Sequence, residues 1–116
     1  MKIKLLILAA LLLAVADYAH AQYALIRHVT ATVTTASSTV LAAPTTTRKL
    51  LYLENDSDTT IYCNFHGDTA TVNAGGRLNA SGGSFWWDQP GTIPATAINC
   101  IHGGTGNKTL LIGIGE

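Results

Sequence analysis

Hydrophobic and polar residues alternate along most of this chain in short stretches that turn-forming residues separate. A period of two is typical of a strand with one buried face, because successive side chains point to opposite sides. In the first stretch, 23–34, Val29 and Val33 belong to an apolar inner face and threonines to the outer one. Arg27 interrupts the inner face, so we expect a bulge or twist near it.

The same pattern recurs to the end of the chain, and no helical period follows residue 22. Strong turn signals, such as the Asn/Asp/Ser run at 55–58, fall every 8–12 residues. This spacing predicts an all-β fold: a single antiparallel β-sandwich or jelly-roll-like domain of six to eight short strands. Further strands are expected at 48–54, 59–65, 85–87, 95–101 and 108–114, with a fragment at 71–73 and a looser stretch at 36–44 that carries a short apolar pair before Pro44 interrupts pairing.

A glycine-bracketed stretch, 75–90, combines two glycine pairs with three consecutive aromatic residues. Glycine adopts positive φ without steric cost, so each pair predicts a tight reversal or bulge. Phe85 and Trp87 share one face of the strand that follows, and we assign them to the core because two large side chains bury more area than one. Trp86 should then face outward.

The N-terminus has the features of a signal peptide. A short basic segment precedes an apolar run at 5–15 that is too short to span a bilayer as a helix. Small residues at Ala19 and Ala21 fit a signal-peptidase site, which predicts a helical leader at 1–21, cleavage between Ala21 and Gln22, and export to the periplasm or the extracellular space. The alternative is an uncleaved membrane anchor. The exported domain, 22–116, would have 95 residues (116 − 21).

Charge limits the range of partners. Residues 22–116 carry five basic and six acidic side chains, a net charge of −1 (5 − 6), without a basic patch. We therefore expect no nucleic-acid partner and, once the leader is removed, no membrane partner.

Cys63 and Cys100 are the only cysteines. In an exported chain an even pair predicts a disulfide, and two buried free thiols are the alternative. His66 and His102 lie near them in sequence, which raises the possibility of a zinc site. Cys63 and His66 are three residues apart and should face opposite sides of a strand, so we expect no metal site.

The sequence contains no recognisable catalytic motif. Ser81 and Ser84 lie among glycines without a base beside them, and Gly103–Gly106 lacks the Lys-Ser/Thr pair of a phosphate-binding loop. We expect no enzymatic activity, no catalytic residue and no cofactor. Trp86 and Tyr62 are the candidates for contact with a partner or ligand, whereas a Trp that merely covers a sheet edge is the structural alternative.

Residues 48–116 resemble small phage virion proteins of the head-decoration or head–tail accessory type. Four segments carry the resemblance: an Arg-Lys-Leu-Leu-x-x-x-Asn strand, an Ile-Tyr-x-x-Phe strand, a glycine turn that leads to an aromatic-Asp pair, and a Pro-containing loop before an Ala-Ile strand. They lie at 48–55, 61–65, 82–88 and 93–101.

The resemblance implies a non-enzymatic structural protein that associates with itself or with a larger protein shell, located in a virion. The rival interpretation is an exported β-sandwich that binds carbohydrate or a cell-surface partner through the segment of Trp86 and Trp87. A small secreted enzyme is a third and weaker possibility.

Overall fold

The computed structural model describes residues 26–116, so the predicted leader at 1–21 and the cleavage site between Ala21 and Gln22 lie outside the described residues. The described residues form eight strands and no helix, and none of them belongs to a helix that could cross a membrane. The strands are β1 (Ile26–Val33), β2 (Ser38–Leu41), β3 (Leu50–Asn55), β4 (Ile61–Asn64), β5 (Gly76–Leu78), β6 (Gly83–Trp87), β7 (Ile98–His102) and β8 (Lys108–Gly115).

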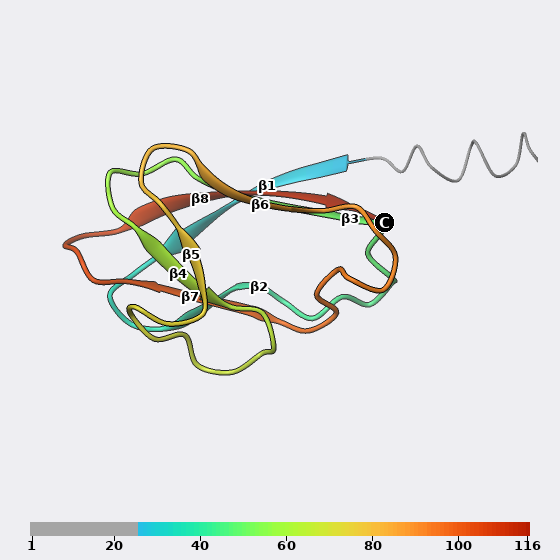
Figure 1. The fold of residues 1–116 in the computed structure, drawn as a ribbon, viewed down its shortest axis with the longest axis horizontal. Helices are drawn as coiled ribbons and strands as arrows, with labels where there is room; N and C mark the ends of the chain where they lie inside the picture. Colours follow the sequence, from blue (N-terminus) through green and yellow to red (C-terminus); the bar gives the residue numbers. More distant parts are fainter. Residues whose placement is uncertain (1–25) are drawn as a thin grey trace, which may run out of the picture.

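The strands follow one long antiparallel hairpin, with β1–β4 in one arm and β5–β8 in the other, and this hairpin folds over to form two sheets (Figure 1). β1 pairs with β8, β2 with β7, β3 with β6 and β4 with β5, all antiparallel. Further pairing of β3 with β8 and of β4 with β7 produces two four-stranded sheets. Sheet A has the order β1-β8-β3-β6 and sheet B the order β2-β7-β4-β5. This is jelly-roll connectivity, and it confirms the predicted fold class.

The core lies between the two sheets and follows the alternation of the strands. In β3, Leu51 and Leu53 are fully buried, whereas Tyr52 between them is not. β7 alternates in the same way. Partly buried side chains close the sides of this layer. The buried core residues are Val33, Leu51, Leu53, Ile61, Cys63, Leu78, Ile98, Cys100, Leu110, Ile112 and Ile114.

The bulge expected near Arg27 is absent, because β1 and β8 pair without interruption from Ile26 to Val33. Arg27 lies close to the end of the sheet, where its side chain remains 61% exposed and approaches Glu116 at 3.9 Å. Arg27 is therefore on the same side of β1 as the inward-facing Val29 and Val33, but its side chain is not buried. The irregularity occurs instead in β2, between Thr39 and Leu41.

The strand fragment expected at 71–73 is also wrong. Ala74 N donates to Thr71 O at 3.2 Å, which closes a turn. The strand comes slightly later, as β5, and begins within the first glycine pair. A Cβ on Gly76 would lie 2.3 Å from the Phe65 ring, so the packing of that ring requires glycine there.

Asn55 joins two turns at one end of the sandwich. Its buried Nδ2 lies within 3.1 Å of the carbonyl oxygens of Thr59, Leu78 and Asn79, and its Oδ1 accepts from the backbone N–H and hydroxyl of Ser57. The β3–β4 turn is thus tied to the β5–β6 turn. A buried amide is stable only when such partners satisfy it.

Cys63 and Cys100 lie directly opposite each other on β4 and β7. Their sulfur atoms are 2.00 Å apart and their Cα atoms 4.1 Å apart, so the pair forms a disulfide in the middle of sheet B. The predicted disulfide is therefore present, and the alternative of two buried free thiols is wrong. Cysteines joined in a disulfide cannot serve as thiolate ligands of a zinc ion. His66 is exposed in a loop and His102 is buried on β7, and no metal-binding cluster exists among residues 26–116.

Reduction should destabilise the protein strongly. The disulfide closes a loop of 37 residues, and loop-closure entropy assigns it about 4 kcal/mol. In a domain of this size, that corresponds to a fall in Tm of more than about 10 °C. Thermal unfolding followed by circular dichroism, with and without reductant, measures the change. The double variant Cys63→Ala/Cys100→Ala is the control, since its Tm should not respond to reductant. An equal Tm in both conditions for the wild type would contradict the bond.

Acid should weaken a contact between the β3–β4 turn and β8. Lys108 Nζ donates to Asp58 Oδ1 at 2.7 Å and, with the Thr59 hydroxyl, lowers the pKa of that carboxyl. Because folding favours the ionised form, this contribution is present above the unfolded-state pKa of about 3.9 and is lost as pH falls through the lower folded-state value.

We therefore expect Asp58→Asn to lose less stability than the wild type when pH is lowered from about 5 to about 2. Urea unfolding across this range measures the slope. Asp56→Asn, a change in the same turn at a residue without an ion pair among the described residues, should retain the wild-type slope. A wild-type slope in Asp58→Asn would show that the contact does not contribute.

Candidate functional site

Trp86 is the most exposed large hydrophobic side chain of the described residues, at 56%, followed by Ile26 at 45%. The alternation of β6 explains this exposure, because Phe85 and Trp87 on either side of Trp86 turn inward and pack against the core. The predicted orientation of the three aromatic residues is confirmed. Trp86 therefore projects from the outer face of sheet A.

The pairing of the strands places Trp86 in a row that crosses the whole sheet. His28 on β1 lies opposite Gly113 on β8, Gly113 opposite Tyr52 on β3, and Tyr52 opposite Trp86 on β6. The Tyr52 and Trp86 rings meet edge to face, with centroids 5.2 Å apart and planes inclined by 60°. Such pairs add about 0.5–1.5 kcal/mol beyond the area they bury.

Ile26 and Tyr52 both lie over Gly113 on the outer face of sheet A. A Cβ on that glycine would lie 3.6 Å from Ile26 and 3.6 Å from Tyr52, so both side chains cover the central strand. The apolar surface thus continues from β1 to β6. We call it the Trp86 face; it consists of Ile26, Leu50, Tyr52, Trp86 and Leu111.

The inward-facing aromatic residues have a different role. Phe85 and Trp87 stack with centroids 5.3 Å apart, and Phe65 from the end of β4 meets both edge to face. These three rings, the aromatic seal, close the side of the sandwich where β5 and β6 form the edges of the two sheets. Trp87 is therefore a packing residue.

Tyr62 is not brought together with Trp86. It lies on β4 in sheet B, whereas Trp86 lies on β6 in sheet A, so their outward faces look in opposite directions. The Tyr62 hydroxyl donates to Asn73 Oδ1 at 2.8 Å, which ties β4 to the turn before β5. Sequence parity could identify both side chains as outward-facing but could not assign them to different sheets.

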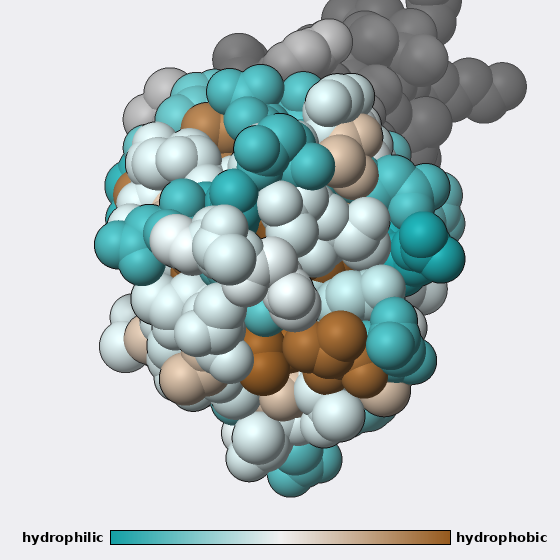
Figure 2. All heavy atoms as spheres, turned by 90° about the vertical axis from the view of Figure 1, so that its left-hand side faces the viewer, coloured by the Kyte–Doolittle hydropathy of each residue, from teal (hydrophilic) through white to brown (hydrophobic). Residues whose placement is uncertain are grey.

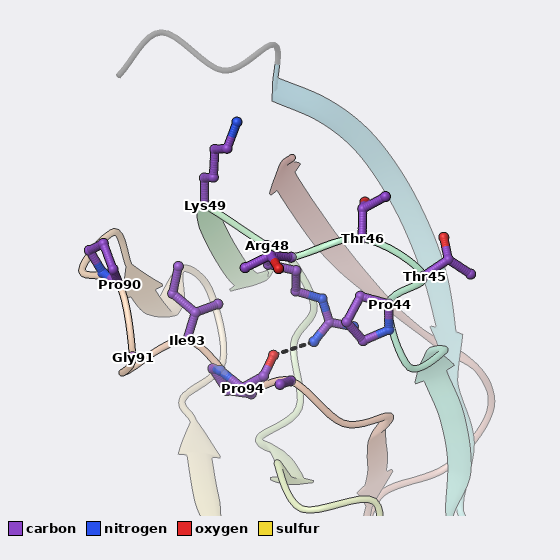
Figure 3. Close-up of a pocket in the computed structure, with 11 residues that line it drawn as sticks. Pro44, Thr45, Thr46, Arg48, Lys49, Pro90, Gly91, Ile93 and Pro94 are labelled. Carbon is purple, nitrogen blue, oxygen red and sulfur yellow. Dashed lines mark hydrogen bonds between the residues drawn. The ribbon is translucent and has the colours of Figure 1, made fainter. Parts of the chain in front are cut away.

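A groove of about 520 Å³ opens at the end of the sandwich where β3 begins (Figure 3). Arg48 lies between its two walls, which contain Pro44 on one side and Ile93 and Pro94 on the other, while Lys49 extends away. The lining residues are Pro44, Thr45, Thr46, Thr47, Arg48, Lys49, Pro90, Gly91, Ile93, Pro94 and Ala95.

Arg48 is buried and holds this end together. Its Nη1 donates to the carbonyl oxygens of Pro94 and Thr96, and its Nη2 to that of Ala42 at 2.7 Å. Burial lowers the pKa of Arg48, and the negative charge of Glu116 opposes this by raising it. The group stays charged at any ordinary pH. From the sequence, Arg48 is predicted only to begin a strand. No sequence pattern indicates that it binds three carbonyl oxygens, an arrangement we call the Arg48 clamp.

His102 is the one buried imidazole of the described chain. Its Nδ1 accepts from Gly104 N at 3.1 Å, and its Nε2 has no hydrogen-bond partner. It lies opposite Ile61 on the inner side of sheet B, in a fully buried position. Its burial removes it from contact with a ligand at the surface.

The opposite end of the sandwich carries the β3–β4 and β7–β8 turns. Figure 2 shows this end as mostly polar and neutral surface, with one compact apolar cluster. Asp56 and Asp58 are exposed there. The Trp86 face and the Arg48 groove are two surfaces whose composition and shape suit contact with a partner.

Arg48→Lys should destabilise the protein by about 2–4 kcal/mol. An ammonium cannot reproduce the planar fork that reaches three partly buried carbonyl oxygens, and hydrogen bonds from a charged donor contribute about 1.5–3 kcal/mol each. Urea unfolding measures the difference. Lys49→Met, a change at the exposed neighbour, is the control and should stay within about 0.5 kcal/mol of the wild type. A similarly small effect of Arg48→Lys would contradict the clamp.

Comparison with protein families, with curated proteins and with solved structures found no match to this chain.

Proposed function

We propose that this protein is a non-enzymatic assembly component of a phage virion, of the head-decoration or head–tail accessory type, and that it packs against a larger protein shell through the Trp86 face. The observation that carries the proposal is the exposure of Trp86 within an apolar surface that spans all four strands of sheet A. Large exposed apolar patches mark interaction sites, and Trp is enriched among residues that dominate binding energy.

The chemistry of the face supports protein packing. Ionisable groups are sparse on the outward positions of sheet A, where Glu54 on β3 and His28 on β1 border the apolar residues. The core of a protein interface is typically depleted in charge and enriched in aromatic residues. The disulfide and the paired strands beneath the face hold it in one shape, which reduces the entropy lost on binding.

The distribution of the resemblance also supports the proposal. Its four segments contain β3, β4, β6 and all of β7 but its last residue; these strands belong to both sheets and include the disulfide, the aromatic seal and Trp86. The similar residues thus belong to the structural centre of the domain. A resemblance of fold alone would not carry function, so the proposal depends on the Trp86 face.

Carbohydrate binding by an exported domain is the second candidate, favoured by the exposed indole itself. Sugars stack on flat aromatic surfaces, whereas the Tyr52 and Trp86 planes are inclined by 60° and present no common plane. This geometry fits interlocking protein side chains better than a pyranose ring.

Trp86→Ala should leave folding nearly intact and weaken shell binding by about tenfold or more, because an exposed aromatic anchor is lost. Trp87→Ala should instead cost about 3 kcal/mol of stability, because it removes one ring of the aromatic seal. Thermal unfolding and co-sedimentation with virions assembled without the protein measure the two effects.

Tyr62→Ala is the control, since it removes an outward aromatic residue from the other sheet and should leave co-sedimentation unchanged. Retained virion binding by Trp86→Ala would contradict the proposal. Binding of the wild type to oligosaccharides and not to virions would favour the second candidate.

A further inference from the structure

We infer that strand β1 is a self-association edge, where β1 of a second copy adds antiparallel and extends sheet A across two molecules. β1 is eight residues long and pairs with β8 along its whole length. Its other edge has no neighbouring strand, and no backbone hydrogen bond of the described residues reaches it. Alternate residues of such a strand direct both N–H and C=O away from the existing partner.

The other three sheet edges have features that discourage pairing. β5 has three residues, β2 has four and carries the irregularity at Thr39/Leu41, and β6 has five and lies over the aromatic seal. Natural proteins limit edge pairing with short strands, bulges, prolines and charged side chains. β1 has no bulge, proline or lysine, and its one permanently charged residue, Arg27, lies near the end of the strand. Among the edges described, β1 alone is long and regular, and it carries no Lys, Arg, Asp or Glu from His28 to Val33.

The packing beneath β1 also supports strand addition at this edge. The β5–β6 side of the sandwich is closed by the aromatic seal, whereas the β1–β2 side ends in smaller apolar side chains that remain partly exposed. Val29 and Ala31 point inward from β1, and Val40 and Leu41 meet the core from β2. A strand added at β1 would complete the burial of Val29 and Ala31.

The sequence of β1 is complementary to itself. A two-fold axis perpendicular to the sheet pairs residues that point to the same face, and an axis through Thr30 uses Arg27 to Val33. Val29 then lies opposite Ala31 on the inner face. On the outer face Thr30 lies opposite Thr30 and His28 opposite Thr32. Paired threonines are favourable, and no like charges face each other. This self-complementarity is why we assign the edge to a second copy.

Dimerisation at β1 goes beyond the proposed function, since it uses the sheet edge and leaves the outer face free. The perpendicular axis turns both Trp86 faces to the same side of the extended sheet. Two linked faces bind a repetitive surface more tightly than one, because the second contact forms at high effective concentration. The dimer would thus be a bivalent unit for a shell built from repeated subunits.

A charge swap at Thr30 tests the pairing. Thr30 is exposed, so Thr30→Lys and Thr30→Glu should fold normally, yet each places two like charges opposite each other across the axis. Sedimentation velocity should show a dimer for the wild type and a dissociation constant about fivefold higher or more for each variant. An equimolar mixture of the two variants should restore association, since Lys then faces Glu.

Thr109→Lys is the matched control, because Thr109 is exposed on β8, away from the edge. It should dimerise like the wild type. The inference is overturned if the wild type is monomeric up to about 1 mM, if Thr30→Lys dimerises as well as the control, or if mixing restores nothing. Trp86→Ala should still dimerise, so failure of the proposed function is distinguishable from failure of this pairing.

Discussion

The covalent bond between Cys63 and Cys100 is the constraint on which the rest of the domain depends. A chain of this size buries a small core, and cross-linking supplies stability that packing alone provides sparingly. The bond joins the central strands of sheet B, β4 and β7, which come from opposite arms of the doubled hairpin. With these strands fixed in register, Phe65, two residues after Cys63, enters the aromatic seal, and the seal packs against β6, which carries the outward Trp86.

Two polar side chains perform the equivalent task at the two ends of the sandwich. Arg48 gathers carbonyl oxygens from the β2–β3 and β6–β7 connections, and Asn55 gathers them from the β3–β4 and β5–β6 turns. Loops contain backbone groups that no ladder satisfies, and burying them requires a side chain with several donors. Arginine and asparagine supply those donors, so irregular segments can close both ends of the core.

The alternation of apolar and polar residues along the sequence was enough to predict the fold class, most strands and the outward direction of Trp86. It failed where three-dimensional contacts decide. β5 has three residues, too few for a period, and its start is set by the Phe65 ring above Gly76. Arg27 interrupts the apolar pattern of the sequence, but the pattern does not show that this position lies near the end of the sheet, where the side chain reaches solvent and Glu116. The Arg48 clamp joins segments nearly fifty residues apart, and no local pattern encodes that distance.

The placement of the chain ends also determines how the domain would respond to mechanical force. Ile26 lies opposite Gly115, so a pull on the two ends of the described chain would peel β1 from β8 from the same end of the sheet. The ladder would open one hydrogen bond at a time, which requires less force than shearing many bonds together. Extension would then stop at the disulfide, because the segment that joins Cys63 to Cys100, a sequence separation of 37 and about 130 Å of extended chain, cannot lengthen while that bond is intact.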